Sequence, residues 1–288
     1  MRTLLHTLTV LALVLAGCGN DKKPPPPDGM TVTPPPATVH DNNMDVPAIY
    51  ACNGSRMDPA GSPTEFMVNG KVADFQSGSG VAGAVISVFP DTAAVMANQP
   101  YDTKTCDNAG NFTALKIPAN HYRVAFKSTA TDQIDTFEFG IPIPPGTTTT
   151  TRNSVSRLTA TALPTLVGID YDMTKAAVAG GVRDCGPAGG GLGRFVKGAL
   201  IAVTVGGAPV PDGQVFYFSD NDLPVRKTQQ QWTNTDGLFT ALNLPSGMAT
   251  VEARAVLTAG SQPVVVGREM VPLMGGSLSI VDVSPLAH

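Results

Sequence analysis

Hydrophobic and polar residues alternate with a period of two in several short stretches of the chain. The two clearest stretches have Tyr122, Val124 and Phe126 alternating with Arg123, Ala125 and Lys127, and Val251, Ala253 and Ala255 alternating with Glu252 and Arg254. This period predicts β-strands with one buried face. Residues 107–110 and 234–237 are rich in Asn, Asp and Gly, which are typical of turns between strands. The pattern therefore predicts small antiparallel β-sandwiches.

The two halves of the chain repeat the same order of segments. Residues 68–74, 83–88, 110–112 and 115–118 match residues 178–184, 198–203, 237–239 and 242–245. The growing offset means that the second copy carries about five and then about twelve extra residues. A repeat of this length predicts two tandem domains with one fold.

The repeated segments resemble the carboxypeptidase regulatory-like (transthyretin-like) domain family. The family pattern is a G-x-V-x-D strand, a G-A-x-V-x-V strand, a D-x-x-G-x-F turn and then L-P-x-G-x-Y-x-V, and residues 66–127 and 178–256 follow it. Asn120 stands at a glycine position and Ala249 at the tyrosine position; Asn tolerates the same left-handed backbone as Gly. The resemblance implies non-catalytic modules with an Ig-like/transthyretin-like sandwich fold.

The N-terminus has the layout of a secretory signal peptide. Arg2 precedes an apolar run, which ends in small residues at Cys18. These last residues resemble the lipobox of bacterial lipoproteins, which implies cleavage before Cys18 and acylation of that cysteine. Gly19 replaces the aspartate that retains such proteins in the inner membrane, so the resemblance implies the outer membrane as the destination. The membrane is then a partner through the lipid anchor.

The resulting organisation is all-β, with two tandem antiparallel sandwiches after a lipidated, disordered tether. The predicted segments are a signal peptide (1–17), a proline-rich tether (18–46), a first sandwich (47–163), a linker (164–177) and a second sandwich (178–288). The composition agrees, because only 15% of residues are charged while 30 are Gly and 25 are Pro. The formal net charge of −4 argues against a nucleic-acid partner.

Catalytic and metal-binding chemistry finds little support in the sequence. Of the four histidines, only His121 falls inside a predicted domain, and one histidine does not make the usual zinc site. We therefore expect no cofactor, no metal and no enzyme activity. Two further patterns stay open: Asp220-Asn221-Asp222 is either a calcium ligand set or an exposed turn, and Lys71 with Glu138 invites comparison with Lys–Asn isopeptide sites.

Three cysteines remain after lipidation of Cys18. The order of the chain favours a disulfide between Cys52 and Cys106, which leaves Cys185 as a free thiol. The alternative, Cys52–Cys185, stays open because sequence alone does not fix connectivity.

The extra residues of the second copy are the predicted place for a binding site, because insertions form loops and loops carry function. If Phe216 and Phe218 point inward, Tyr217 points outward and forms an aromatic platform with Trp232, beside Asp220 and Asp222. The alternative is that Trp232 anchors the core.

These expectations together predict a surface or periplasmic lipoprotein that serves as a binding or structural module, with a protein or polysaccharide partner. An accessory subunit of an envelope enzyme or export complex is the alternative.

Overall fold

The computed structural model describes residues 39–40, 50, 52, 57–185, 193–258 and 260–285. The predicted signal peptide, Cys18 and most of the predicted tether lie outside these residues. The described residues belong to one compact unit that begins at Pro34. Within them, no helix has the length and apolar character needed to cross a bilayer.

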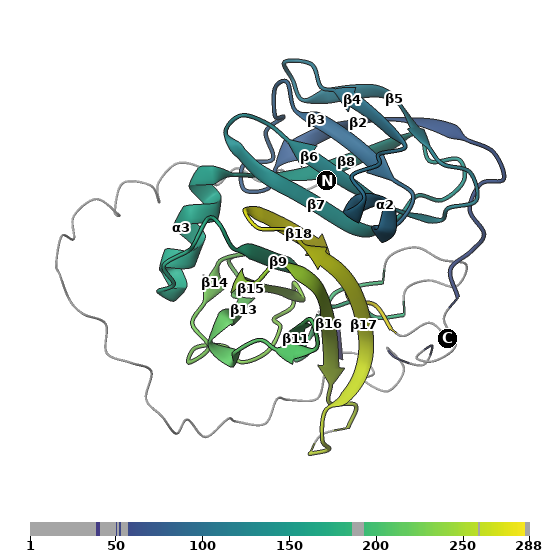
Figure 1. Ribbon diagram of the computed structural model, residues 1–288. Helices are drawn as coiled ribbons and strands as arrows, with labels where there is room; N and C mark the ends of the chain where they lie inside the picture. The colour runs from purple at the N-terminus through teal and green to yellow at the C-terminus, as the bar shows by residue number, and fades with distance from the viewer. Residues whose placement is uncertain are drawn as a thin grey trace. The chain divides into compact units, whose positions relative to one another are not determined.

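The first sandwich consists of seven strands and one short helix (Figure 1). These are β2 (Phe66–Asp74), β3 (Val85–Phe89), α2 (Thr92–Met96), β4 (Asp102–Thr105), β5 (Asn111–Ile117), β6 (Arg123–Thr129), β7 (Gln133–Pro142) and β8 (Thr149–Ser156). A longer helix, α3 (Arg157–Val167), follows β8.

The second sandwich begins after α3. Its elements are β9 (Ala176–Gly181), β10 (Val196–Lys197), β11 (Leu200–Val205), β12 (Ala208–Pro209), the 3₁₀ helix η1 (Asp212–Gln214), β13 (Val215–Phe218), β14 (Pro224–Val225), β15 (Leu238–Leu244), β16 (Gly247–Ala255), β17 (Val264–Leu273) and β18 (Ser277–Val281). The longer insertion of the second copy lies between β11 and β15, in the stretch that contains β12, η1, β13 and β14.

Both sandwiches share one pattern of strand pairing. β2 pairs with β5 antiparallel and with β8 parallel, and β9 pairs in the same way with β15 and β18. The opposite sheets run β4-β3-β6-β7 and β12-β11-β16-β17. The predicted all-β sandwich fold is confirmed. Each copy nevertheless contains a parallel pair, so the sheets are mixed rather than purely antiparallel.

The core of each sandwich is filled from alternate positions of its strands. Val72, Ile86, Phe112 and Phe126 are at most 2% exposed and lie in the core of the first sandwich. A second cluster joins the core of the second sandwich to Phe137 and other residues of the first. The core of the second sandwich therefore extends onto Phe137 and Phe139 of β7, which are not part of the first sandwich's own core.

Strand β18 joins the two sandwiches. It pairs in parallel with β9 on one side and with β7 of the first sandwich on the other, with Ser277 opposite Asp135 and Val281 opposite Phe139. Figure 1 shows β18 between these two strands. One continuous sheet of twelve strands results.

The segments around the sandwiches differ from the predicted organisation in two places. Val39 and His40 form β1, which pairs with β10, so the expectation of a wholly disordered tether is wrong at these residues. The open backbone edge of β10 supplies the partner. The predicted linker 164–177 contains the end of α3 and the beginning of β9.

Candidate functional site: an apolar groove between the sandwiches

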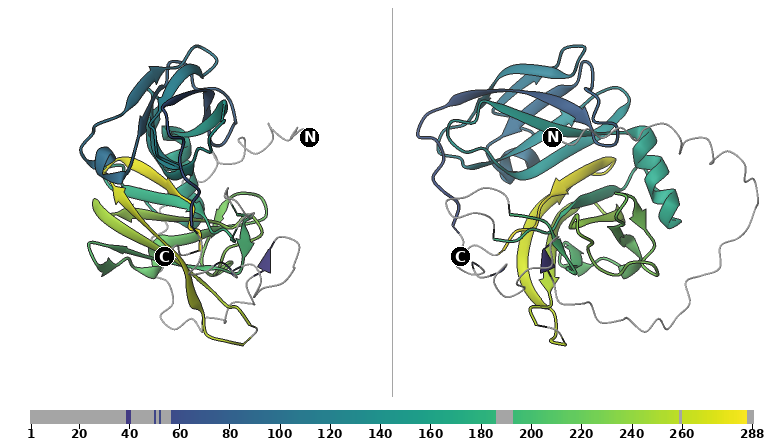
Figure 2. Two further views of the ribbon diagram at one scale, coloured as in Figure 1. Left: turned by 90° about the vertical axis from the view of Figure 1, so that its right-hand side faces the viewer. Right: turned by 180° about the vertical axis from the view of Figure 1, so that it is seen from behind.

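Helix α3 forms one wall of an apolar cavity in the described part of the chain. The Ser156 hydroxyl caps its first turn by accepting a hydrogen bond from the Thr159 N–H at 3.0 Å. Gly168 ends the helix in the left-handed conformation at φ 73°. Pro164 has no N–H to donate to the carbonyl of Ala160, yet packing on its buried face keeps the helix in place. The helix lies along β14, β7 and β8, as Figures 1 and 2 show.

The floor of this cavity is the outer face of the second sandwich. Val178, Phe239 and Val281 point into the sandwich core, so their neighbours point the other way. Those neighbours are Ala177, Ala179, Leu238, Thr240, Leu278 and Ile280, all of which line the cavity. The two alanines leave space above β9 because their side chains end at Cβ.

We call this cavity the groove; its volume is about 330 Å³. Its walls come from α3, from the end of β13, from β14 and from the adjoining end of the first sandwich, and include Leu163, Pro164, Ile134, Val155, Phe218 and Pro224. A mostly apolar cavity of this size is typical of sites for small apolar ligands. None of the sequence patterns described above predicts this groove, although α3 has its buried residues Thr159, Pro164 and Val167 at helical spacing.

A buried carboxylate also lines the groove. Glu138 is 4% exposed. Its Oε1 accepts a hydrogen bond from Asn153 Nδ2 at 2.9 Å, and its Oε2 accepts one from the Asn153 N–H at 3.0 Å. Burial raises the pKa of Glu138, and the charge of Arg152 opposes that rise.

Two arginines also line the groove, and their surroundings differ. Arg183 donates from Nε to Asp282 Oδ2 at 2.6 Å and from Nη1 to the Gly193 carbonyl at 2.8 Å. Its guanidinium lies 3.8 Å from the centre of the Phe195 ring. Arg152 stacks on the Phe126 ring at 5.0 Å, and its nearest acid oxygen is Glu138 Oε1 at 3.7 Å. Arg183 is thus well hydrogen-bonded, whereas Arg152 forms an ion pair at a distance too long for a hydrogen bond.

The predicted aromatic platform does not form. Tyr217 is 1% exposed and lies in the core of the second sandwich, where its hydroxyl accepts a hydrogen bond from the Ile201 N–H at 2.9 Å. Phe216 instead packs on the outer face, against residues of α3 and β15. The prediction had the alternation right and the direction wrong. Trp232 is partly buried, and its carbonyl accepts a hydrogen bond from Gln230.

Asp220 and Asp222 belong to an exposed turn. The side-chain amide of Asn234 donates a hydrogen bond to Asp220. Nearby Asp236 is partly buried, and this burial, together with the charges of Asp222 and Asp220, raises its pKa to about 6. Among the described residues no group of His, Cys, Asp and Glu has an arrangement that could hold a metal ion. The turn interpretation of 220–222 therefore fits this geometry better than the calcium interpretation.

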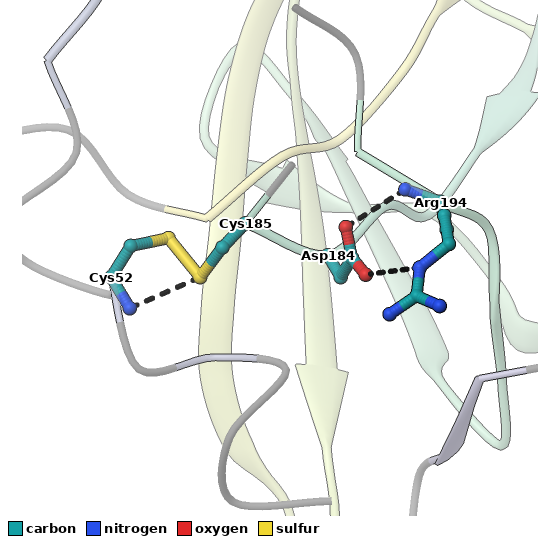
Figure 3. The surroundings of a disulfide bond; sticks show 4 residues. All are labelled: Cys52, Asp184, Cys185 and Arg194. Atoms are coloured by element: carbon teal, nitrogen blue, oxygen red, sulfur yellow. Dashed lines mark hydrogen bonds and ion pairs between the residues drawn. A yellow bond between two sulfur atoms is a disulfide. The ribbon is translucent and has the colours of Figure 1, made fainter. Parts of the chain in front are cut away.

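The preferred disulfide is also corrected. Cys52 is bonded to Cys185, with their Cα atoms 5.7 Å apart, close to the Asp184–Arg194 ion pair (Figure 3). Tyr50, two residues before Cys52, packs in the core cluster of the second sandwich. This packing carries Cys52 away from the first sandwich. Cys106 is a free, buried thiol whose pKa is raised by burial.

The side chains expected at an isopeptide site do not come together. Lys71 Nζ donates to the Gly78 carbonyl at 3.1 Å, while Glu138 is occupied by Asn153 and lies near Arg152. His121, interpreted from the sequence as structural, lies with Nδ1 2.8 Å from the Ala119 carbonyl.

Comparisons with known proteins add little. No protein-family model and no curated protein matches the chain. Among solved structures, the chain is similar to the shaft pilin SpaA from Lactobacillus rhamnosus GG, at 10% identity over 77% of this chain and 98% of that one, with a TM-score of 0.24. A putative carbohydrate binding protein from Bacteroides uniformis ATCC 8492 is 12% identical over 75% of this chain and 99% of that one, with a TM-score of 0.24. The Bacillus anthracis TIE protein is 11% identical over 77% of this chain and 34% of that one, with a TM-score of 0.25. At such low TM-scores these similarities do not identify a function.

Proposed function

We propose that this chain is a cell-envelope lipoprotein whose two sandwiches form a non-catalytic binding module, with the groove as its binding site. The observation that supports the proposal most directly is the apolar cavity of about 330 Å³ between α3 and the second sandwich. The polar groups in it are few, as expected for groups that orient a ligand. The carboxypeptidase regulatory-like resemblance agrees with a binding module.

The chemistry of the groove favours binding over catalysis. Its acidic groups are engaged in fixed contacts, Glu138 with Asn153 and Asp282 with Arg183 and the Gly181 N–H. None of these contacts joins a nucleophile to a general base. The groove therefore has the groups that hold a ligand and lacks the pairing that would activate one.

A neutral apolar fluorophore tests the groove directly. Nile red should bind the full chain carrying Cys18→Ser, purified without detergent, and its fluorescence should rise. Ala179→Phe should abolish the rise because the ring fills the space above β9. Thr149→Phe is the matched control, since Thr149 is exposed on the corresponding face of the first sandwich. Equal dye binding by both variants would contradict the groove as the site.

The lipid anchor has its own test. Cys18→Ser should release the protein from the membrane fraction, because several acyl chains would be lost, each contributing about 0.8 kcal/mol per buried CH₂. Fractionation without detergent measures this. Retention of the variant in the membrane would contradict anchoring at Cys18 and leave the groove unaffected.

A further inference from the structure

Arg152 is an arginine whose hydrogen-bonding capacity is unused. Its side chain is 14% exposed, and within the described residues it takes part in an ion pair at 3.7 Å and a ring contact, with no hydrogen bond. Its Nε is buried without a partner. A guanidinium has five N–H donors, and buried polar groups in proteins are almost always hydrogen-bonded. The side chain lines the groove, so a ligand in the groove can supply the missing acceptor.

The neighbours of Arg152 do not supply that acceptor. Both oxygens of Glu138 already accept hydrogen bonds from Asn153. Asp282 is held by Arg183 and by the Gly181 N–H. The unused donors of Arg152 therefore stand beside an apolar channel in which the charged groups Glu138, Asp282 and Arg183 already have partners.

We propose that the groove binds a fatty acyl group, with the hydrocarbon chain along the floor formed by β9, β15 and β18 and a carboxyl or ester oxygen accepting hydrogen bonds from Arg152. This inference rests on the proposed function and specifies its ligand. The polar group of such a ligand is confined to one end, where it can accept from Arg152 while the rest of the ligand contacts apolar side chains.

Peptides and sugars fit the groove less well. The floor is a sheet face whose strands are already paired on both sides: β9 with β15 and β18, and β18 with β9 and β7. A peptide laid on this face would bring backbone N–H and C=O groups that the apolar floor leaves unpaired. A sugar would bring several hydroxyls with the same cost. An acyl chain has no polar group along its length.

The outer side of α3 is consistent with a lipid ligand. Leu158 and Leu166 are 69% and 46% exposed, so the helix is apolar on the side that faces solvent as well as on the side that lines the groove. Helices with exposed leucines are suited to the boundary of a lipid surface. An acyl chain would reach the groove from such a surface with little exposure to water.

Displacement of Nile red by palmitate tests the proposal on the full chain carrying Cys18→Ser. Palmitate should displace the dye, and hexadecyltrimethylammonium, which has the same chain and no acceptor oxygen, should displace it at least tenfold less well. Myristate should bind about 15-fold more weakly than palmitate if both lost CH₂ groups were buried at about 0.8 kcal/mol each.

Two variants test the role of Arg152. Arg152→Met should weaken palmitate binding at least tenfold more than it weakens Nile red binding, because the neutral dye does not depend on a charged donor, whereas Arg152→Lys should recover part of the loss because it keeps one charged donor. Arg152→Met leaves the Glu138 carboxylate without its cation, and the double variant Arg152→Met/Glu138→Gln removes that charge. Circular dichroism checks that each protein is folded. With carboxyl-¹³C palmitate, the carboxyl resonance should shift on binding to the parent protein and not to folded Arg152→Met.

The outcomes separate the two proposals. If Nile red binds in the groove and palmitate does not displace it, or if the ammonium compound competes equally well, the fatty acyl inference is wrong and the binding groove stands. If Nile red itself fails to bind, both proposals are wrong.

Discussion

The same outer face has opposite character in the two sandwiches. In the first, Asn69 of β2 lies opposite Thr149 of β8, and both are exposed. In the second, Ala179 of β9 lies opposite Ile280 of β18 at the corresponding positions of the repeat, and both are partly buried in the groove. A shared fold therefore carries a solvated face in one copy and an apolar face in the other. Apolar faces need a covering group, and α3 covers this one only in part.

The two sandwiches also differ in how far the sheet extends beyond the strands compared above. Within the described strands, β5 pairs only with β2, whereas its counterpart β15 pairs with both β9 and β13. The residues inserted in the second copy thus extend the sheet that carries the groove. Their effect is to widen the apolar face, not to present a loop with an aromatic platform.

The largest expected effect comes from matched aromatic residues in the two cores. Phe112 and Phe239 hold equivalent positions and are 2% and 0% exposed. Phe112→Ala and Phe239→Ala should each lower the free energy of unfolding by about 3–5 kcal/mol. Urea denaturation should show one transition in each variant, because β18 pairs with β7 and the core of the second sandwich includes Phe137 and Phe139 of β7. Two separate transitions would mean that the sandwiches unfold independently.

The disulfide gives the next largest effect. Cys52→Ser should cost about 2–4 kcal/mol, because the Cys52–Cys185 bond closes a loop of 133 residues in the unfolded chain. Cys106→Ala keeps this bond and is the control, so its melting temperature should still fall on addition of a reductant. A reductant that leaves the melting temperature of Cys106→Ala unchanged would argue against the Cys52–Cys185 pairing.

The strand order could be predicted from the sequence because its signals are local. Period-two alternation and turn residues repeat in both copies, and Gly110 and Gly237 adopt the positive φ values, 80° and 65°, that such turns require. Asn120 likewise takes φ 63° where the family pattern has glycine. Each of these features depends on a few neighbouring residues.

The groove could not be predicted because it depends on contacts between distant segments. Alternation in β13 indicates that Tyr217 and Phe216 point in opposite directions, but it does not say which side is the core. Both sides of β13 are buried here, since α3 covers the outer one. Pro164 and several threonines hide α3 itself, because such residues are weak helix formers. The sequence did contain one signal of the groove: the polar Asn69 of the first copy is replaced by the apolar Ala179 at the equivalent position of the second.

The corresponding turns of the two copies should respond oppositely to pH. Asp236 has a pKa raised to about 6, so the folded state binds its proton more tightly than the unfolded chain, and stability rises as pH falls from about 7 to about 4. Hydrogen bonds from Asn111 lower the pKa of Asp107. The contribution of Asp107 to the free energy of unfolding is therefore present above the pKa that Asp107 has in the unfolded chain, and it is lost as pH falls below about 4.

Asp236→Asn tests this contrast. It should stabilise the protein by about 1–2 kcal/mol at pH 7–8, after a discount for partial exposure. It should also remove the rise in stability that the parent protein shows as pH falls from about 7 to about 4. Asp107→Asn should give no gain at neutral pH. Thermal melts between pH 4 and 8 measure both, and equal responses of the two variants would contradict the opposite shifts.

The smallest expected effect comes from exchanging single residues between the two outer faces. Ile280→Thr should weaken Nile red binding about fourfold, since the loss of one apolar group in the groove is worth about 0.8 kcal/mol. It should lower stability by about 1 kcal/mol because Ile280 is only partly buried. The reciprocal Thr149→Ile should change stability by less than about 0.5 kcal/mol and leave dye binding as it is, because one apolar side chain on a polar, exposed face has little to contact. Fluorescence titration and melting of the two variants side by side measure these differences. If the two exchanges have equal effects on dye binding, the dye does not distinguish the polar outer face of the first sandwich from the apolar outer face of the second. The difference between the two faces would then have no consequence for binding.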